Sequence, residues 1–214
     1  MIELRAFTPS EAARISGVNL ALQRDWRRRG YLPKLEGPSE FDAFGVASML
    51  CVELLTRRGI GPAVSKPLAS LLGAGVVKAA IEVQAGFGGA LKGVAGPVER
   101  IAVTDRDSLD LVQASQGGAD EAYWTWYGRA QAISAEIFSA RPEAEQRVER
   151  AFCWWADGTS EFVDSIIRLL EALEPSDPRL AGPVIMLDFS ALAALFLDRC
   201  EGPFATYMES GEGD

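Results

Sequence analysis

The chain has 214 residues, of which 48% are hydrophobic and 24% are charged, and its formal net charge is −9. This composition is typical of a soluble globular protein and excludes a disordered chain. The sequence contains no histidine, which excludes histidine-based catalysis and zinc sites of the Cys/His type. Its three cysteines, Cys51, Cys153 and Cys200, lie far apart, and we expect buried thiols rather than a disulfide framework.

The negative charge is distributed unevenly along the chain. Through Leu72 there are 10 Lys and Arg against 7 Asp and Glu, a net charge of +3. The remainder has 11 against 23, a net charge of −12. A mildly basic head on an acidic body is compatible with a single nucleic-acid-contacting face and with dimerisation to strengthen the contact.

Residues 19–29 are predicted to form a basic amphipathic helix. Asn19 is a favourable N-cap, and Gly30 supplies the left-handed residue that commonly ends a helix. Leu22 and Trp26 share one side of the helical wheel and are expected to be buried. The opposite half carries Gln23, Arg24, Arg27 and Arg28.

A shorter helix is predicted upstream, over residues 9–16. Thr8 or Ser10 can cap it, Pro9 suits its first turn, and Gly17 permits a tight turn into the next helix. Two short helices joined by a glycine-containing turn, with the second one basic, are typical of a helix-turn-helix.

The run TPSEAARISGV at 8–18, followed by Arg24, Trp26 and RRGYLP at 28–33, resembles the start of a MerR-type winged helix-turn-helix regulator. Residues 41–60 (FDAFGVASMLCVELLTRRGI) continue the resemblance, which covers about residues 7–68. In that family the second helix enters the major groove, and the following loop is a wing that contacts the DNA backbone. The resemblance therefore implies double-stranded DNA as a partner.

Particular residues match or depart from the family pattern. Arg24 matches the helix arginine of the family, and Trp26 stands where an aromatic residue is usual. Asp42 replaces the basic wing residue, which removes one expected phosphate contact. No sustained heptads follow Pro67, so the usual dimerising coiled coil is absent. The cysteine pattern of the metal-sensing branch is absent as well.

The remaining elements are predicted from periodicity and turn residues. A turn-rich wing is expected at 33–40, a helix at 44–58, a short element from Pro62 that Pro67 ends or kinks, a helix at 76–85 and a strand at 100–104. Helices are then expected at 119–139, 142–156 and 159–174, a strand at 184–189 and a last helix from Ser190 to about Cys200. We interpret Gly73 and Gly75 as small residues for close helix packing.

The expected fold class is mainly α. Residues 1–70 form a MerR-like winged helix-turn-helix domain, with the boundary somewhere within 67–78. Residues 71–205 form a mostly helical domain with one or two short strands, for dimerisation or sensing, and 206–214 form an acidic tail. The first seven residues lack a signal-peptide run, and the apolar run at 184–197 is shorter than a bilayer span. We therefore expect a cytoplasmic protein with no membrane segment.

The predicted function is sequence-specific binding of double-stranded DNA by a dimeric transcription regulator that is not an enzyme and needs no cofactor. Gln23 is expected to read a base edge, and the arginines to contact groove and phosphates. The expected DNA-binding residues are Thr8, Asn19, Gln23, Arg24, Arg27, Arg28 and Lys34.

Several alternatives remain open for the second part and for the whole protein. An aromatic set can serve as core, as a dimer interface or as a pocket for a small-molecule effector. It comprises Tyr123, Trp124, Trp126, Trp154 and Trp155. The head can instead be a protein-interaction module of an adaptor or antitoxin-like protein. A small-molecule-binding enzyme is the third class, with Asp188 as its most site-like carboxylate or, alternatively, as a helix cap.

Overall fold

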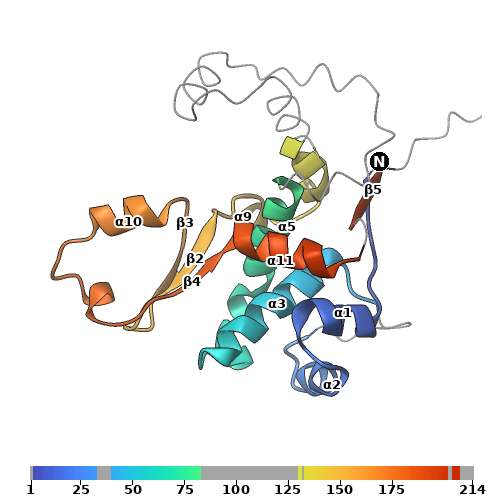
Figure 1. Ribbon diagram of the computed structural model, residues 1–214, viewed down its shortest axis with the longest axis horizontal. Coiled ribbons are helices and arrows are strands. Elements are labelled where there is room, and N and C mark those ends of the chain that lie inside the picture. The colour runs from blue at the N-terminus through green and yellow to red at the C-terminus, as the bar shows by residue number, and fades with distance from the viewer. Residues whose placement is uncertain (1, 33–39, 83–129, 132, 202–203, 208–214) are drawn as a thin grey trace, which may run out of the picture.

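The computed structural model describes residues 2–32, 40–82, 130–131, 133–201 and 204–207, and it is mainly helical with a small three-stranded sheet (Figure 1). The described helices are α1 (Pro9–Ser16), α2 (Leu20–Arg28), α3 (Ala43–Arg57), α4 (Pro62–Ser65), α5 (Ala69–Glu82), α9 (Glu143–Gln146), α10 (Ile166–Ala172) and α11 (Phe189–Arg199). Two 3-10 turns are η1 (Lys66–Leu68) and η3 (Pro178–Ala181). The strands are β1 (Ile2–Leu4), β2 (Ala151–Trp154), β3 (Ser160–Val163), β4 (Ile185–Asp188) and β5 (Ala205–Tyr207).

Helices α1 and α2 confirm the two predicted N-terminal helices, and both begin at the expected capping residues. The hydroxyl of Thr8 accepts the N–H of Glu11, whose carboxylate in turn accepts the backbone N–H of Thr8. Gly17 ends α1 with a φ of 81°. The side-chain oxygen of Asn19 accepts the N–H of Leu22 at 2.9 Å, which starts α2.

The chain enters α3 through a short pairing with the N-terminal segment. Phe7 and Phe41 exchange two backbone hydrogen bonds of 2.8 and 2.9 Å. Asp42 then caps α3, because its carboxylate accepts the N–H of Gly45 at 2.7 Å. An acidic residue at this position therefore has a structural role at a helix N-terminus. Of the expected wing, 33–39 lie outside the described residues.

Helix α5 is the central element of the core and packs against both α3 and α11. Pro67 lies in η1, which confirms the predicted break. However, α5 begins at Ala69, earlier than the expected helix at 76–85, so Gly73 and Gly75 lie inside a helix. A Cβ at Gly73 would approach the oxygen of the Ser48 hydroxyl to 2.2 Å, and one at Gly75 would approach the Phe189 ring to 2.5 Å. The two glycines thus serve close helix packing, as predicted.

The C-terminal part contains a sheet where a helix was expected. Strand β2 pairs antiparallel with both β3 and β4, so the strand order is β3-β2-β4. The predicted helix at 142–156 is wrong beyond α9, and the predicted helix at 159–174 is wrong over its first residues. The physical reason is the turn at Asp157-Gly158, where Gly158 has a φ of 86° and joins β2 to β3 as a hairpin.

The expected strand and last helix near the C-terminus are confirmed as β4 and α11. The cap of α11 is Asp188 rather than Ser190, because its carboxylate accepts the N–H of Ala191 at 3.0 Å. Asp188 therefore acts as a helix cap, which was the structural alternative for this carboxylate.

The principal core does not divide at residue 70. The expected boundary lies within or next to α5, and buried residues from Phe7 to Ala205 form one hydrophobic cluster. Strand β1 pairs antiparallel with β5, so residues 206 and 207 belong to a strand and not to a tail. Arg14 also forms an ion pair of 3.1 Å with Glu201. The first and the last of the described strands are thus held together.

Three remaining expectations concern other segments. The strand at 100–104 lies outside the described residues, as does most of the helix at 119–139, of which 130–131 and 133–138 are helical. One helical run, Pro62–Glu82, is long and apolar enough by length and composition to cross a membrane. Half of its most apolar window is buried within the protein, as in a core helix.

We predict that Gly73→Ala lowers the free energy of unfolding by about 1–3 kcal/mol, as overpacked cores do. The added methyl would also meet the Phe44 carbonyl oxygen at 2.6 Å, so backbones rather than a flexible side chain must move. Urea denaturation followed by circular dichroism measures the change. Ser70→Ala, at an exposed position of the same helix, is the control and should change stability little. Equal stability of the glycine variant and the wild type would contradict the packing described.

Candidate functional site

The outer face of α2 carries three exposed arginines. The side chains of Arg28 and Arg29 are 75% and 59% exposed, and both form ion pairs with Asp25. Arg24 is also exposed, and its Nε donates to the carbonyl of Leu20 at 3.2 Å. Arg29 was not among the expected contact residues. It is found on this face because it shares Asp25 with Arg28 at i+3 and i+4 spacing.

The contacts that these arginines already make would not prevent them from binding an anion. Exposed ion pairs within one helix contribute little to stability, because water screens both charges. The hydrogen bond of Arg24 uses one of the five N–H donors of a guanidinium. All three side chains therefore retain donors that can meet phosphate or a base edge.

Gln23 does not lie on this face, and its expected role as a base reader is wrong for this structure. Its side chain is 2% exposed, and its Nε2 donates to the carbonyls of Pro9 and Val18, both at 2.9 Å. The helical wheel places Gln23 between the arginines and the apolar stripe. Only the tertiary structure shows that α1 lies on this side of α2. The Gln23 amide therefore contacts protein and joins the start of α1 to the turn before α2.

Arg27 is likewise turned toward the protein. Its guanidinium lies over the ring of Phe41, with 5.3 Å between Cζ and the ring centroid. Its Nε and Nη2 are buried and make no hydrogen bond. The expected groove contact by Arg27 therefore does not fit this conformation, because stacking on Phe41 holds the side chain against the segment that leads into α3.

Two expected contact residues, Thr8 and Asn19, are the N-caps of α1 and α2, so their side-chain oxygens already serve the helices. Hydrogen bonds from the backbone and hydroxyl of Thr8, together with Arg5, hold the pKa of Glu11 below its usual value. The capping carboxylate is thus ionised at neutral pH. Lys34, the expected phosphate contact at the wing, lies outside the described residues.

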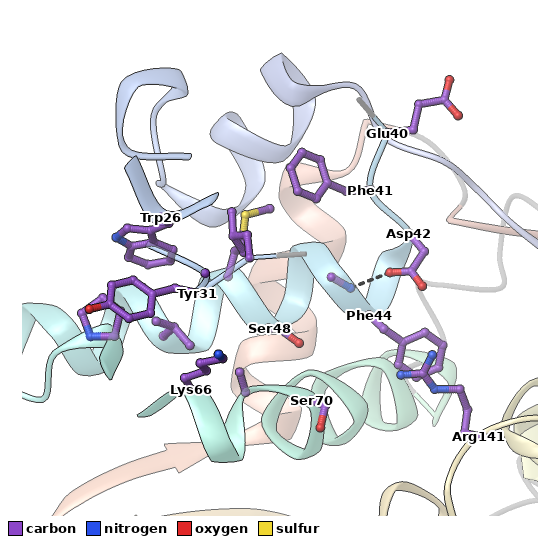
Figure 2. A pocket seen from close by; sticks show the side chains of 17 residues that line it. Trp26, Tyr31, Glu40, Phe41, Asp42, Phe44, Ser48, Lys66, Ser70 and Arg141 are labelled. Atoms are coloured by element: carbon purple, nitrogen blue, oxygen red, sulfur yellow. Dashed lines mark hydrogen bonds between the residues drawn. The ribbon is translucent and has the colours of Figure 1, made fainter. Parts of the chain in front are cut away.

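A groove of about 770 Å³ lies beside α2 and was not predicted from the sequence (Figure 2). Its walls are largely aromatic and aliphatic, and they include Trp26, Tyr31, Phe41, Phe44 and Met49. Figure 2 shows the Lys66 side chain directed toward the space between these walls. No short motif marks this groove, because its lining comes from α2, α3, α5, the segments between them and residue 141.

The expected aromatic set is only partly visible. Tyr123, Trp124 and Trp126 lie outside the described residues. Trp154 is half-buried and packs edge-on against Phe152. Trp155 is 3% exposed, and its indole N–H donates to Glu161 at 2.8 Å. For these two tryptophans the core-packing alternative is the one that fits.

The cysteines are unsuited to nucleophilic chemistry. All three are free and buried, which confirms the prediction of buried thiols. Burial raises the pKa of Cys153 to about 11 and that of Cys200 to about 11, and it raises the pKa of Cys51 further. Over the part of the chain that the structure describes, no three Cys, Asp or Glu side chains gather as a metal site.

Comparison of the chain with protein-family models, with curated proteins and with solved structures finds no match. Its function is therefore inferred from its own residues and their geometry. Among the described residues, the exposed arginines of α2 and the aromatic groove beside them are two features that can bind another molecule.

We predict that Gln23→Ala destabilises the protein by about 1–3 kcal/mol, because it removes the two hydrogen bonds that join the start of α1 to the turn before α2. Thermal unfolding followed by circular dichroism measures the effect. Arg24→Ala, one residue along the same helix but exposed, is the control and should unfold close to the wild type. A Gln23→Ala protein of unchanged stability would restore the view that this amide serves recognition.

Proposed function

We propose that this protein is a sequence-specific regulator that binds double-stranded DNA through a MerR-like winged helix-turn-helix, with α2 as the recognition helix. One observation carries the proposal. Helix α2 is anchored by the buried Trp26 and Gln23, while Arg24, Arg28 and Arg29 project from its exposed side. A helix fixed on one side and cationic on the other can be presented to a groove as a rigid unit.

The chemistry of the exposed face supports DNA over other anions. The major groove admits an α-helix, and a guanidinium can donate two hydrogen bonds to O6 and N7 of guanine or to phosphate oxygens. Arg24 and Arg28 lie four residues apart, on one side of the helix. In this proposal both contact the groove and its phosphates, Arg29 contacts backbone, and Gln23 and Arg27 act as positioning residues.

The acidic remainder of the chain is compatible with this role. A net charge of −12 beyond Leu72 repels DNA, so contact is confined to the basic head. We propose a cytoplasmic homodimer, because two copies of the head would double the contacts on a two-fold site. A small-molecule effector in the groove beside Trp26 is also part of the proposal, since an occupant there would press on the anchored side of α2.

Replacing Arg24 and Arg28 together by alanine is predicted to weaken DNA binding at least tenfold. Each lost phosphate contact should reduce the slope of log K against log salt by about 1. Fragments selected from genomic DNA by the wild-type protein serve as ligands. Fluorescence anisotropy at several salt concentrations measures both affinity and slope.

A matched control removes two exposed arginines elsewhere, in Arg147→Ala/Arg150→Ala. This variant has the same net charge as the α2 variant and should bind as the wild type does. Equal loss in both variants would indicate a nonspecific charge effect. Failure of the wild type to select any duplex would overturn the proposal and favour the protein-interaction alternative.

A further inference from the structure

We propose that the outer side of α10, together with the edge of the sheet at β4, is the surface through which two copies of this chain associate. The proposal deepens the proposed function by naming the dimer surface, but it concerns association alone and needs no DNA. Figure 1 shows α10 at the opposite end of the molecule from α1 and α2. Association there leaves the basic helix free.

Helix α10 carries apolar side chains on both sides, although the described residues cover only one of them. Ile166, Leu169 and Leu173 pack on a second, smaller core formed by the outer face of the sheet. Ile167 and Leu170 point elsewhere and are 71% and 45% exposed. No residue of this seven-residue helix is fully buried. A helix of this length does not persist by itself in water, so uncovered apolar side chains on it indicate a missing neighbour.

The exposed apolar side chains are concentrated in this part of the chain. Across the described residues, seven large hydrophobic side chains are exposed, and five of them lie within residues 167–186. Besides the two on α10 they are Leu180, Val184 and Met186. Strand β4 is at the edge of the described three-stranded sheet, and its sequence Ile-Met-Leu-Asp has no charge before its last residue. Unprotected apolar edges of this kind are rare in isolated monomers.

The charges on α10 identify the occupant as a second copy. Arg168 and Glu171 lie one turn apart on the exposed part of the helix, and neither forms an ion pair with another described residue. When two such helices lie antiparallel about a two-fold axis, Arg168 of one copy comes opposite Glu171 of the other, and the reverse pair forms at the same time. The surface is thus complementary to itself, with Ile167 and Leu170 beside the charge pairs.

A charge-reversal series tests this arrangement on the full chain by sedimentation velocity, without DNA. Arg168→Glu places acids opposite acids, and Glu171→Arg places bases opposite bases, so each variant alone should raise the dimer dissociation constant at least tenfold. An equimolar mixture of the two variants should recover dimers, because the unlike copies are complementary. The double variant Arg168→Glu/Glu171→Arg should recover them as well.

Two further variants separate the surface from general effects on folding. Ile167→Glu should give monomers, whereas Val64→Glu, at an aliphatic residue that is 56% exposed on α4, should leave association unchanged. Circular dichroism confirms that each variant is folded. A wild-type protein that stays monomeric at high concentration would overturn the inference. Dimers that are insensitive to Arg168→Glu, Glu171→Arg and Ile167→Glu would overturn it too. Neither result would decide whether α2 binds DNA.

Discussion

The close approach of α5 to its two neighbours is the constraint on which the rest of the structure depends. Gly73 brings the backbone of α5 against Phe44 and Ser48 of α3, and Gly75 makes room for the ring of Phe189. Through these contacts, helices from the N-terminal third and the last helix share one core. The basic head and the acidic body therefore contribute to the same hydrophobic core.

Within the head, polar groups determine what is presented to solvent. The caps at Thr8 and Asn19 set where α1 and α2 begin, and the Gln23 amide joins them through two carbonyls. Because the inner side of α2 is held in this way, Arg24, Arg28 and Arg29 lie on its outer side and are exposed to solvent. The inner side of α2 is thus held by the hydrogen bonds of the Gln23 amide as well as by the buried indole of Trp26.

The C-terminal half shows how local pattern and tertiary structure can disagree. Residues 142–156 contain good helix formers and three large aromatic side chains, a composition that favours a helix by propensity. The pair Asp157-Gly158 that follows is typical of a hairpin turn. The strand forms in place of the helix because β2 pairs with β3 on one edge and with β4 on the other. Phe152 is buried in the principal core on one face of the sheet, and Cys153 is buried in the smaller core on the other face. Consecutive side chains point to opposite faces in a strand but not in a helix.

By itself, the sequence determined the boundaries and caps of α1 and α2, the glycine turns, the packing role of Gly73 and Gly75, the buried thiols and the last strand and helix. These depend on local backbone chemistry and on the apolar or polar character of each residue. Only the tertiary structure decided that Gln23 and Arg27 face inward, that Arg29 joins the exposed set, and that β1 pairs with β5 across the whole chain. The reason is physical. A helical wheel gives the angle of a side chain but not its neighbours, and neighbours distant in sequence decide whether a polar group meets protein or water.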